Sequence, residues 1–79
     1  MEFVINETSD RHGYVQLADQ LRAKIQAGEY TDRLPSLTKL IDQSGLSMSS
    51  VQHAVAVLKD EGLVYSVKGR GIFVARRSQ

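Results

Sequence analysis

Two closely spaced helix starts constrain the fold of this chain more than any other feature of the sequence. Ser36 follows a proline, which pushes the residue before it out of helical geometry, and serine is a favoured helix N-cap. Gly45 ends the short apolar pattern that follows, and Ser47 is a second N-cap two residues later. This spacing predicts helices over 37–44 and 48–61 joined by a turn of about three to four residues, which is the signature of a helix-turn-helix.

A further helix and a hairpin flank this unit. An apolar stripe at helical spacing predicts a helix over 14–27, and Gly28 suits the left-handed residue just past its end. After Gly62 the apolar period switches from about 3.6 to two, which is typical of strands. Segments 63–67 and 72–75 then flank a basic turn that contains glycine, and they predict a β-hairpin. The expected fold is mainly α with a small β-hairpin: a three-helix winged helix-turn-helix.

The length of the chain, 79 residues, suits one domain only. We place the winged helix-turn-helix at residues 14–77, followed by a short tail at 78–79. Residues 1–13 precede it as an N-terminal arm, in which the apolar run at 3–5 predicts a short strand before a stretch of turn formers. The core is expected to be modest, because so short a chain buries only about 60% of the surface of its unfolded form.

Charge is spread unevenly along the chain. The net charge is +1, from ten basic and nine acidic residues. Residues 62–79 carry four basic side chains and no acid, whereas residues 1–61 carry six basic and nine acidic side chains. A basic C-terminal segment on a nearly neutral chain favours contact with a polyanion there, and the alternative is a solvated basic tail.

Several classes of protein are excluded by what the sequence lacks. Without cysteine, no disulfide framework, thiolate nucleophile or zinc knuckle can form. There is no apolar stretch of about 18 residues and no secretory signal, so we expect no membrane span and a cytoplasmic protein. His12 and His53 lack partners at metal-ligand spacing, and the sequence has no nucleophile elbow, no phosphate loop after a strand and no pair of acids with a pocket to raise a pKa. We therefore expect no enzyme, no metal and no cofactor.

Four runs of residues carry a resemblance to one family. They are YVQLADQLRAKIQAGEY from Tyr14, DRLPS at 32–36, SGLS at 44–47 and DEGLVYSVKGRGIFVA at 60–75. With these runs in this order, the chain from about Tyr14 to Ala75 resembles the DNA-binding domain of GntR-type bacterial transcription regulators. The resemblance implies that the third helix enters the major groove of DNA, that the hairpin, or wing, lies at the flanking minor groove, and that dimers bind palindromic sites.

The chain departs from the family at several positions that are commonly basic. Thr38, Met48 and Gln52 stand where the family commonly has arginine, and Ala56 and Val57 stand at two further basic positions. These differences imply that phosphate affinity comes from the wing and the basic tail. The family's ligand-sensing and dimerising domain has no counterpart here, so we expect no small-molecule effector and only a weak homodimer or cooperative assembly on DNA.

The exposed side of the 48–61 helix is the candidate reading surface. Its apolar stripe is expected to be buried, which leaves serine, glutamine and histidine side chains exposed. Gln52 can pair bidentately with adenine, and serine hydroxyls can donate or accept at base edges. Met48 lies at the border of the stripe, and we interpret it first as core, with contact to thymine methyl groups or a partner protein as the alternative. The same polar surface could be merely solvated, or bind a protein.

The tip of the wing and the two helix starts are the other candidate contacts. An arginine held at the tip can enter a narrow minor groove, and the alternative is an ordinary hairpin turn with solvated charges. Serine N-caps lie at helix N-termini, where exposed backbone N–H groups attract phosphates. The residues expected to contact DNA are Ser36, Thr38, Ser47, Met48, Ser49, Ser50, Gln52, His53, Lys68, Gly69 and Arg70.

These patterns predict a small protein that binds specific double-stranded DNA, and the resemblance implies that it is bacterial and nucleoid-associated. The expected function is transcriptional repression, with the 48–61 helix reading the major groove and the wing at 63–75 flanking it. One alternative within the same class is an architectural, excision or plasmid-control factor. Another, from a different class, is a winged helix that binds a protein, which the loss of basic residues from the reading helix would favour.

Overall fold

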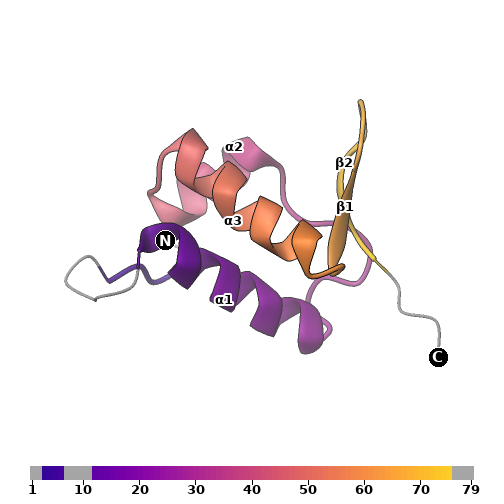
Figure 1. The fold of residues 1–79 in the computed structure, drawn as a ribbon, viewed down its shortest axis with the longest axis horizontal. Helices are drawn as coiled ribbons and strands as arrows, with labels where there is room; N and C mark the ends of the chain where they lie inside the picture. Colours follow the sequence, from indigo (N-terminus) through magenta and orange to yellow (C-terminus); the bar gives the residue numbers. More distant parts are fainter. Residues whose placement is uncertain (1–2, 7–11, 76–79) are drawn as a thin grey trace.

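The computed structural model describes residues 3–6 and 12–75, which form three helices followed by a hairpin (Figure 1). The predicted winged helix-turn-helix is confirmed, and its three helices and two strands are found within one residue of their expected bounds. The elements are α1 (Gly13–Gln26), α2 (Leu37–Ser44), α3 (Met48–Asp60), β1 (Val64–Val67) and β2 (Gly71–Val74).

The helix-turn-helix is built by the predicted caps. The hydroxyl oxygen of Ser36 accepts a hydrogen bond from the backbone N–H of Lys39, and that of Ser47 accepts one from Ser50, both at 3.2 Å. Gly45 ends α2 in the left-handed conformation, with φ of 78°. Each serine cap contributes about 1 kcal/mol to helix stability, so these local contacts fix where the two helices begin.

The core lies where α1 and α2 pack on α3 (Figure 1). The apolar stripes predicted on α1 and α3 are the buried sides of those helices, and β1 and β2 each add one residue from the wing. The buried apolar residues are Phe3, Leu17, Ala18, Leu21, Leu34, Leu40, Val51, Ala54, Val55, Leu58, Val64 and Ile72.

The N-terminal arm contributes to this core through Phe3, which corrects the prediction of a short strand at residues 3–5. Phe3 is only 1% exposed, and its backbone N–H donates to the carbonyl of Gln43 in α2 at 3.1 Å. The Lys24 ammonium lies 5.6 Å from the centre of the Phe3 ring. No strand forms at 3–5, and residues 7–11 of the arm lie outside the described part of the chain.

Two glutamine side chains of α1 take the place of a partner strand. The Gln20 amide accepts from the Val4 backbone N–H at 3.1 Å and donates to the Val4 carbonyl at 2.7 Å. One turn earlier, the Gln16 amide makes the same pair of bonds with Asn6, at 2.7 and 2.9 Å. Val4 and Asn6, two residues apart in the extended arm, are thus bonded to Gln20 and Gln16, four residues apart on one side of α1. These four hydrogen bonds fix the arm along α1.

The wing has a third extended segment that the sequence did not predict. β1 and β2 pair in antiparallel register, and residues 32–34 pair with the other edge of β2. The Leu34 N–H donates to the Ile72 carbonyl at 2.9 Å, and the Val74 N–H donates to the Asp32 carbonyl at 2.8 Å. Because residue 34 lies just before α2, these bonds tie the base of the wing to the helix-turn-helix.

An ion pair connects α1 to the end of α3. The Arg22 guanidinium donates to both carboxylate oxygens of Glu61, at 2.7 and 2.6 Å, and to Asp19 at 2.7 Å. These hydrogen bonds hold the pKa of Glu61 below its usual range, and they raise the pKa of Arg22. The sequence suggested no role for Glu61, and the structure shows that it anchors the chain just before the wing.

We expect the Arg22–Glu61 pair to make stability depend on pH in the acid range. Because the pKa of Glu61 is lower in the folded than in the unfolded chain, the pair stabilises the fold above about pH 4.3, the ordinary pKa of glutamate. This contribution is lost as pH falls through the folded-state pKa. Glu61→Gln should therefore lower Tm at pH 7 slightly, with the difference from wild type vanishing in acid.

Thermal melts from pH 2.5 to 7 would measure this difference. Asp60→Asn is the matched control, because Asp60 is the neighbouring exposed acid and makes no ion pair within the described residues. If Glu61→Gln and Asp60→Asn changed Tm equally at every pH, the Arg22–Glu61 pair would not contribute to stability.

Candidate nucleic-acid interface

The exposed side of α3 carries the side chains predicted to read DNA. Ser49, Gln52 and Ala56 are exposed, and the buried apolar stripe lies on the other side of the helix. Met48 is 44% exposed, so its first interpretation as a core residue was wrong. It begins α3, where the helix has not yet entered the core. Val57, which stands at a position that is commonly basic in the family, is half-buried.

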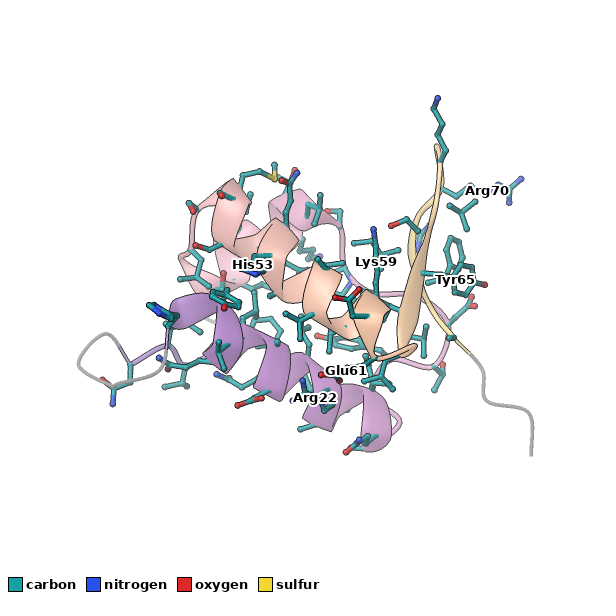
Figure 2. The ribbon with its side chains drawn as sticks, in the orientation of Figure 1. Arg22, His53, Lys59, Glu61, Tyr65 and Arg70 are labelled. Carbon is teal, nitrogen blue, oxygen red and sulfur yellow. The ribbon has the colours of Figure 1, made fainter. Side chains whose placement is uncertain are left out.

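Two predicted contact residues are engaged within the domain itself. Ser50 is half-buried, and its hydroxyl oxygen accepts from the Ser47 hydroxyl at 3.2 Å, so both side chains belong to the cap of α3. The His53 ring is exposed but stacks on Tyr14 of α1, with ring centres 3.8 Å apart and planes 8° from parallel (Figure 2). His12 lies on this stack as well, 5.9 Å from Tyr14. His53 is therefore turned toward α1.

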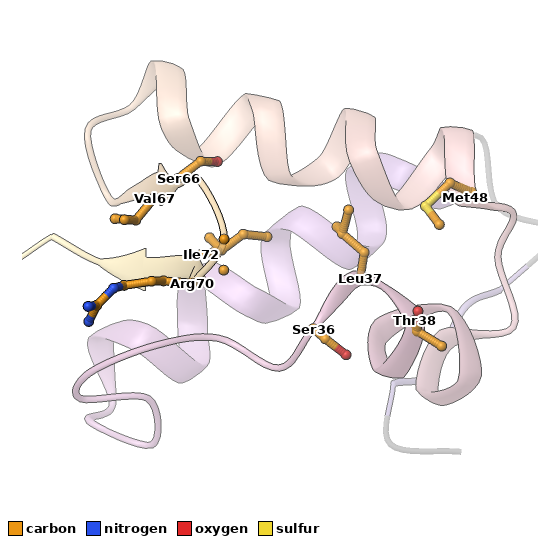
Figure 3. Close-up of a pocket in the computed structure, with 10 residues that line it drawn as sticks. Ser36, Leu37, Thr38, Met48, Ser66, Val67, Arg70 and Ile72 are labelled. Carbon is orange, nitrogen blue, oxygen red and sulfur yellow. The ribbon is translucent and has the colours of Figure 1, made fainter.

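A hollow of about 480 Å³ lies between the start of α2, the start of α3 and the wing (Figure 3). It adjoins a hollow of about 240 Å³ beside Gln52 and Lys59, and another of about 360 Å³ beside Arg33 and Lys39. Adjacent hollows share lining residues, so we treat them as one groove, named the α3–wing groove. Of the predicted contact residues, those that line it are Ser36, Thr38, Met48, Gln52, Gly69 and Arg70.

The remaining predicted residues lie outside this groove. Ser47, Ser49, Ser50 and His53 belong to the start and first turns of α3, and Lys68 extends from the tip of the wing. The structure therefore gathers about half of the predicted residues around one groove and leaves the others along its rim and on α3.

The charges around the groove are all positive. Lys39, Lys59 and Arg70 line it, and within the described residues none of these three, nor Lys68, makes an ion pair. No acidic side chain of the described chain lines any of the three hollows. By contrast, the cations of α1 are neutralised: Arg22 by Asp19 and Glu61, and Lys24 by Glu29 at 3.2 Å. Unpaired cations beside an acid-free hollow attract a polyanion.

Sequence reasoning missed three basic residues of this groove. Lys39 and Lys59 are the only lysine or arginine residues between positions 34 and 62. Their isolation in the sequence was the available signal that they contribute to DNA binding. Arg33 lines the groove too, and its guanidinium donates to the carbonyl of Arg70 at 3.2 Å. Arg33 therefore braces the turn of the wing from the segment that precedes α2.

Within the described residues, neither a metal site nor a membrane span is found. No group of three or more His, Asp and Glu side chains there could hold a metal ion. No helix in that part of the chain has the length and apolar character needed to cross a bilayer.

The fold and the groove together define the class of protein. A helix-turn-helix whose second helix exposes polar side chains beside a basic hairpin is the arrangement of a winged helix-turn-helix DNA-binding domain. The model of the family described as bacterial regulatory proteins, gntR family, matches residues 13–74. The chain belongs to this family and is a DNA-binding domain of it.

Curated relatives agree with this assignment. The chain is 39% identical over 74 residues to the HTH-type transcriptional repressor NagR of Bacillus subtilis (strain 168), covering 91% of this chain and 30% of NagR. It is 36% identical over 64 residues to the histidine utilization repressor of Klebsiella aerogenes, covering 78% of this chain and 27% of that repressor. The chain thus spans less than a third of the length of either relative.

Solved structures match over nearly the whole chain. The DNA-binding domain of AraR in complex with operator ORX1 matches with a TM-score of 0.80 and 26% identity, covering 95% of this chain and 99% of that one. YtrA from Sulfolobus acidocaldarius, a GntR-family transcription factor, matches with a TM-score of 0.86 and 31% identity, covering 99% of this chain and 84% of that one.

Proposed function

We propose that this domain recognises specific duplex sites and represses transcription from promoters that contain them. Its likeness to an AraR domain in complex with an operator is the observation that carries the proposal. In this mode α3 lies in the major groove and the tip of the wing lies in the flanking minor groove. Repression is supported by the two relatives that are named repressors. The protein acts in the bacterial cytoplasm, on the nucleoid, and this domain takes no small-molecule effector.

The roles of individual residues follow from their positions. Gln52 reads adenine through its side-chain amide, and the exposed thioether of Met48 packs on thymine methyl groups. Ser49 donates to or accepts from a base edge beside them. The N-terminus of α2, capped by Ser36, offers backbone N–H groups to a phosphate, and Arg70 enters the minor groove.

A test of sequence-specific binding is selection of duplexes from a random pool, followed by titration of the selected site. Gln52→Ala should weaken binding to that site by about 1–3 kcal/mol and relax the preference at one base pair, because a bidentate contact to one base is lost. Gln26→Ala is the matched control, since Gln26 is exposed at the end of α1, away from the groove. Equal weakening on every sequence would make Gln52 a contact to the DNA backbone.

Assembly on DNA is expected to be cooperative. A single winged domain buries only about 600–1,000 Å² on DNA, which is small for tight specific binding. Phe3 is committed to the core, so the contact between copies would come from α1 or from the rest of the arm, where Val4 is 77% exposed. We therefore expect a monomer or weak dimer in solution, and two copies on half-sites about one helical turn apart.

Sedimentation of the free protein, with titration onto one and two half-sites, would measure this assembly. Binding to the paired half-sites should be tighter per site than binding to one. A tight dimer in solution, or equal affinity per half-site on both DNAs, would remove the cooperative contact.

One observation favours the second candidate function, a protein-interaction module. Met48 and Tyr65 are 44% and 49% exposed, and methionine and tyrosine are residue types enriched at protein interfaces. The unpaired cations and the acid-free lining of the groove argue for DNA instead, because a protein surface does not require them. Salt dependence separates the two functions, since release of counterions makes DNA binding steeply dependent on salt.

A further inference from the structure

The geometry of a DNA duplex requires one strand to pass between α3 and the wing. A major groove and the minor groove beside it are separated by a single sugar-phosphate backbone. A protein that places α3 in one groove and its wing in the next must therefore accommodate that backbone between them. The α3–wing groove occupies this position: its walls come from the start of α2, from α3 and from the wing (Figure 3).

The lining of the groove suits a sugar-phosphate backbone. The half-buried Leu37 provides apolar surface that can pack on a deoxyribose ring, and the buried side chains of Val55 and Ile72 form the apolar base of the hollow. Ser66 and Gln52 provide polar groups beside that surface, and no acidic side chain of the described chain faces a phosphate there. A groove with this pattern of apolar floor, polar walls and positive rim complements one nucleic-acid strand better than it complements an apolar helix.

Lys59 is positioned to bind a phosphate of that strand. It is the only basic residue of α3, and it lies on the side of the helix that faces the wing (Figure 2). It lines the same hollow as Gln52 and Ser66. It is exposed, and it makes no ion pair within the described residues. Lys39 lies in the hollow beyond the start of α2, together with Ser36 and Arg70.

We propose that the α3–wing groove holds a single sugar-phosphate strand, and that Lys59 and Lys39 bind phosphates on it at the two ends of the groove. This proposal rests on the proposed function and adds to it a path for one strand. Lys59 also acts as a positioning residue. Because it shares a hollow with Gln52, a phosphate held by Lys59 fixes the register of Gln52 against the bases.

The first test is the salt dependence of binding to the selected duplex. Each phosphate contact contributes about 0.9 to the slope of log K against log salt, so Lys59→Gln and Lys39→Gln should each flatten the slope by about 0.9. Affinity at 0.1 M salt should fall about 8-fold for each variant, and Lys59→Arg should keep the wild-type slope. Lys24→Gln is the control: this lysine lies on α1, paired with Glu29, and its loss should leave the slope unchanged.

The second test locates the phosphate. Duplexes with one neutral methylphosphonate, placed in turn along the strand between the two contacted grooves, are titrated with wild type and Lys59→Gln. At the phosphate that Lys59 binds, the methylphosphonate should weaken wild type about 8-fold and leave Lys59→Gln unaffected. The strand path would be overturned if both lysine variants kept the wild-type slope. It would also be overturned if, at every phosphate, the methylphosphonate weakened Lys59→Gln as much as it weakened wild type. Neither result would contradict specific binding. Failure of the wild type to select any duplex would overturn the proposed function itself.

Discussion

Phe3→Ala should lower the free energy of unfolding by about 3–5 kcal/mol, which is the cost of removing a buried aromatic ring from a core. Phe3 is 1% exposed and joins α1 to α2, although it lies in the N-terminal arm. Small domains have a total stability of only about 5–15 kcal/mol, so this one substitution should remove a large share of it. Urea denaturation followed by circular dichroism measures the change.

Val4→Ala is the control for Phe3→Ala. Its side chain is 77% exposed, and its two hydrogen bonds to Gln20 come from the backbone, so they survive the substitution. The change in stability should be within about 0.5 kcal/mol. An equally small effect of Phe3→Ala would mean that the arm does not pack into the core in solution.

Local chemistry explains why the helices and the hairpin could be predicted from the sequence. Ser36, Gly45 and Ser47 act on backbone groups within three or four residues, so their effect is readable without knowledge of the fold. The apolar stripes can also be read locally, because apolar residues spaced three or four positions apart lie on the same side of a helix. The switch to a period of two after Gly62 marked the wing for the same reason.

Contacts between distant residues could not be predicted in this way. The Arg22–Glu61 pair joins residues 39 positions apart. In the Gln20–Val4 pairing, a side-chain amide makes the two hydrogen bonds that a neighbouring strand would otherwise make with the Val4 backbone. Neither pattern has a local signature, since glutamine on an amphipathic helix is ordinarily a solvated residue. Leu34 was expected to lie outside helical geometry because a proline follows it, but the pairing of residues 32–34 with β2 depends on how the wing folds back.

The candidate site was predictable in part. The exposed side of α3 followed from the buried stripe, and this placed Gln52 correctly on the surface. Met48 was misassigned because a position at the first turn of a helix lies beyond the packed core. Lys59 was missed because it lies next to two acids in the sequence, although the fold turns it toward the wing (Figure 2).

Lys68→Ala combined with Arg70→Ala should flatten the slope of log K against log salt by up to about 1.8, if both side chains contact phosphates. The corresponding loss of affinity at 0.1 M salt is about 60-fold. The first eleven residues of α3 contain no lysine or arginine, so the wing must supply much of the neutralisation. Titrations of the selected duplex at several salt concentrations measure the slope.

The structure makes this double substitution a test of charge and not of folding. Both side chains are exposed, and Arg33 holds the wing through the backbone carbonyl of Arg70, which alanine retains. Gly69 and Gly71, with φ of 80° and 113°, still provide the left-handed conformations of the turn. A slope equal to that of wild type would place the wing away from DNA. The exposed Met48 and the groove beside it would then be better explained as a surface that binds a protein.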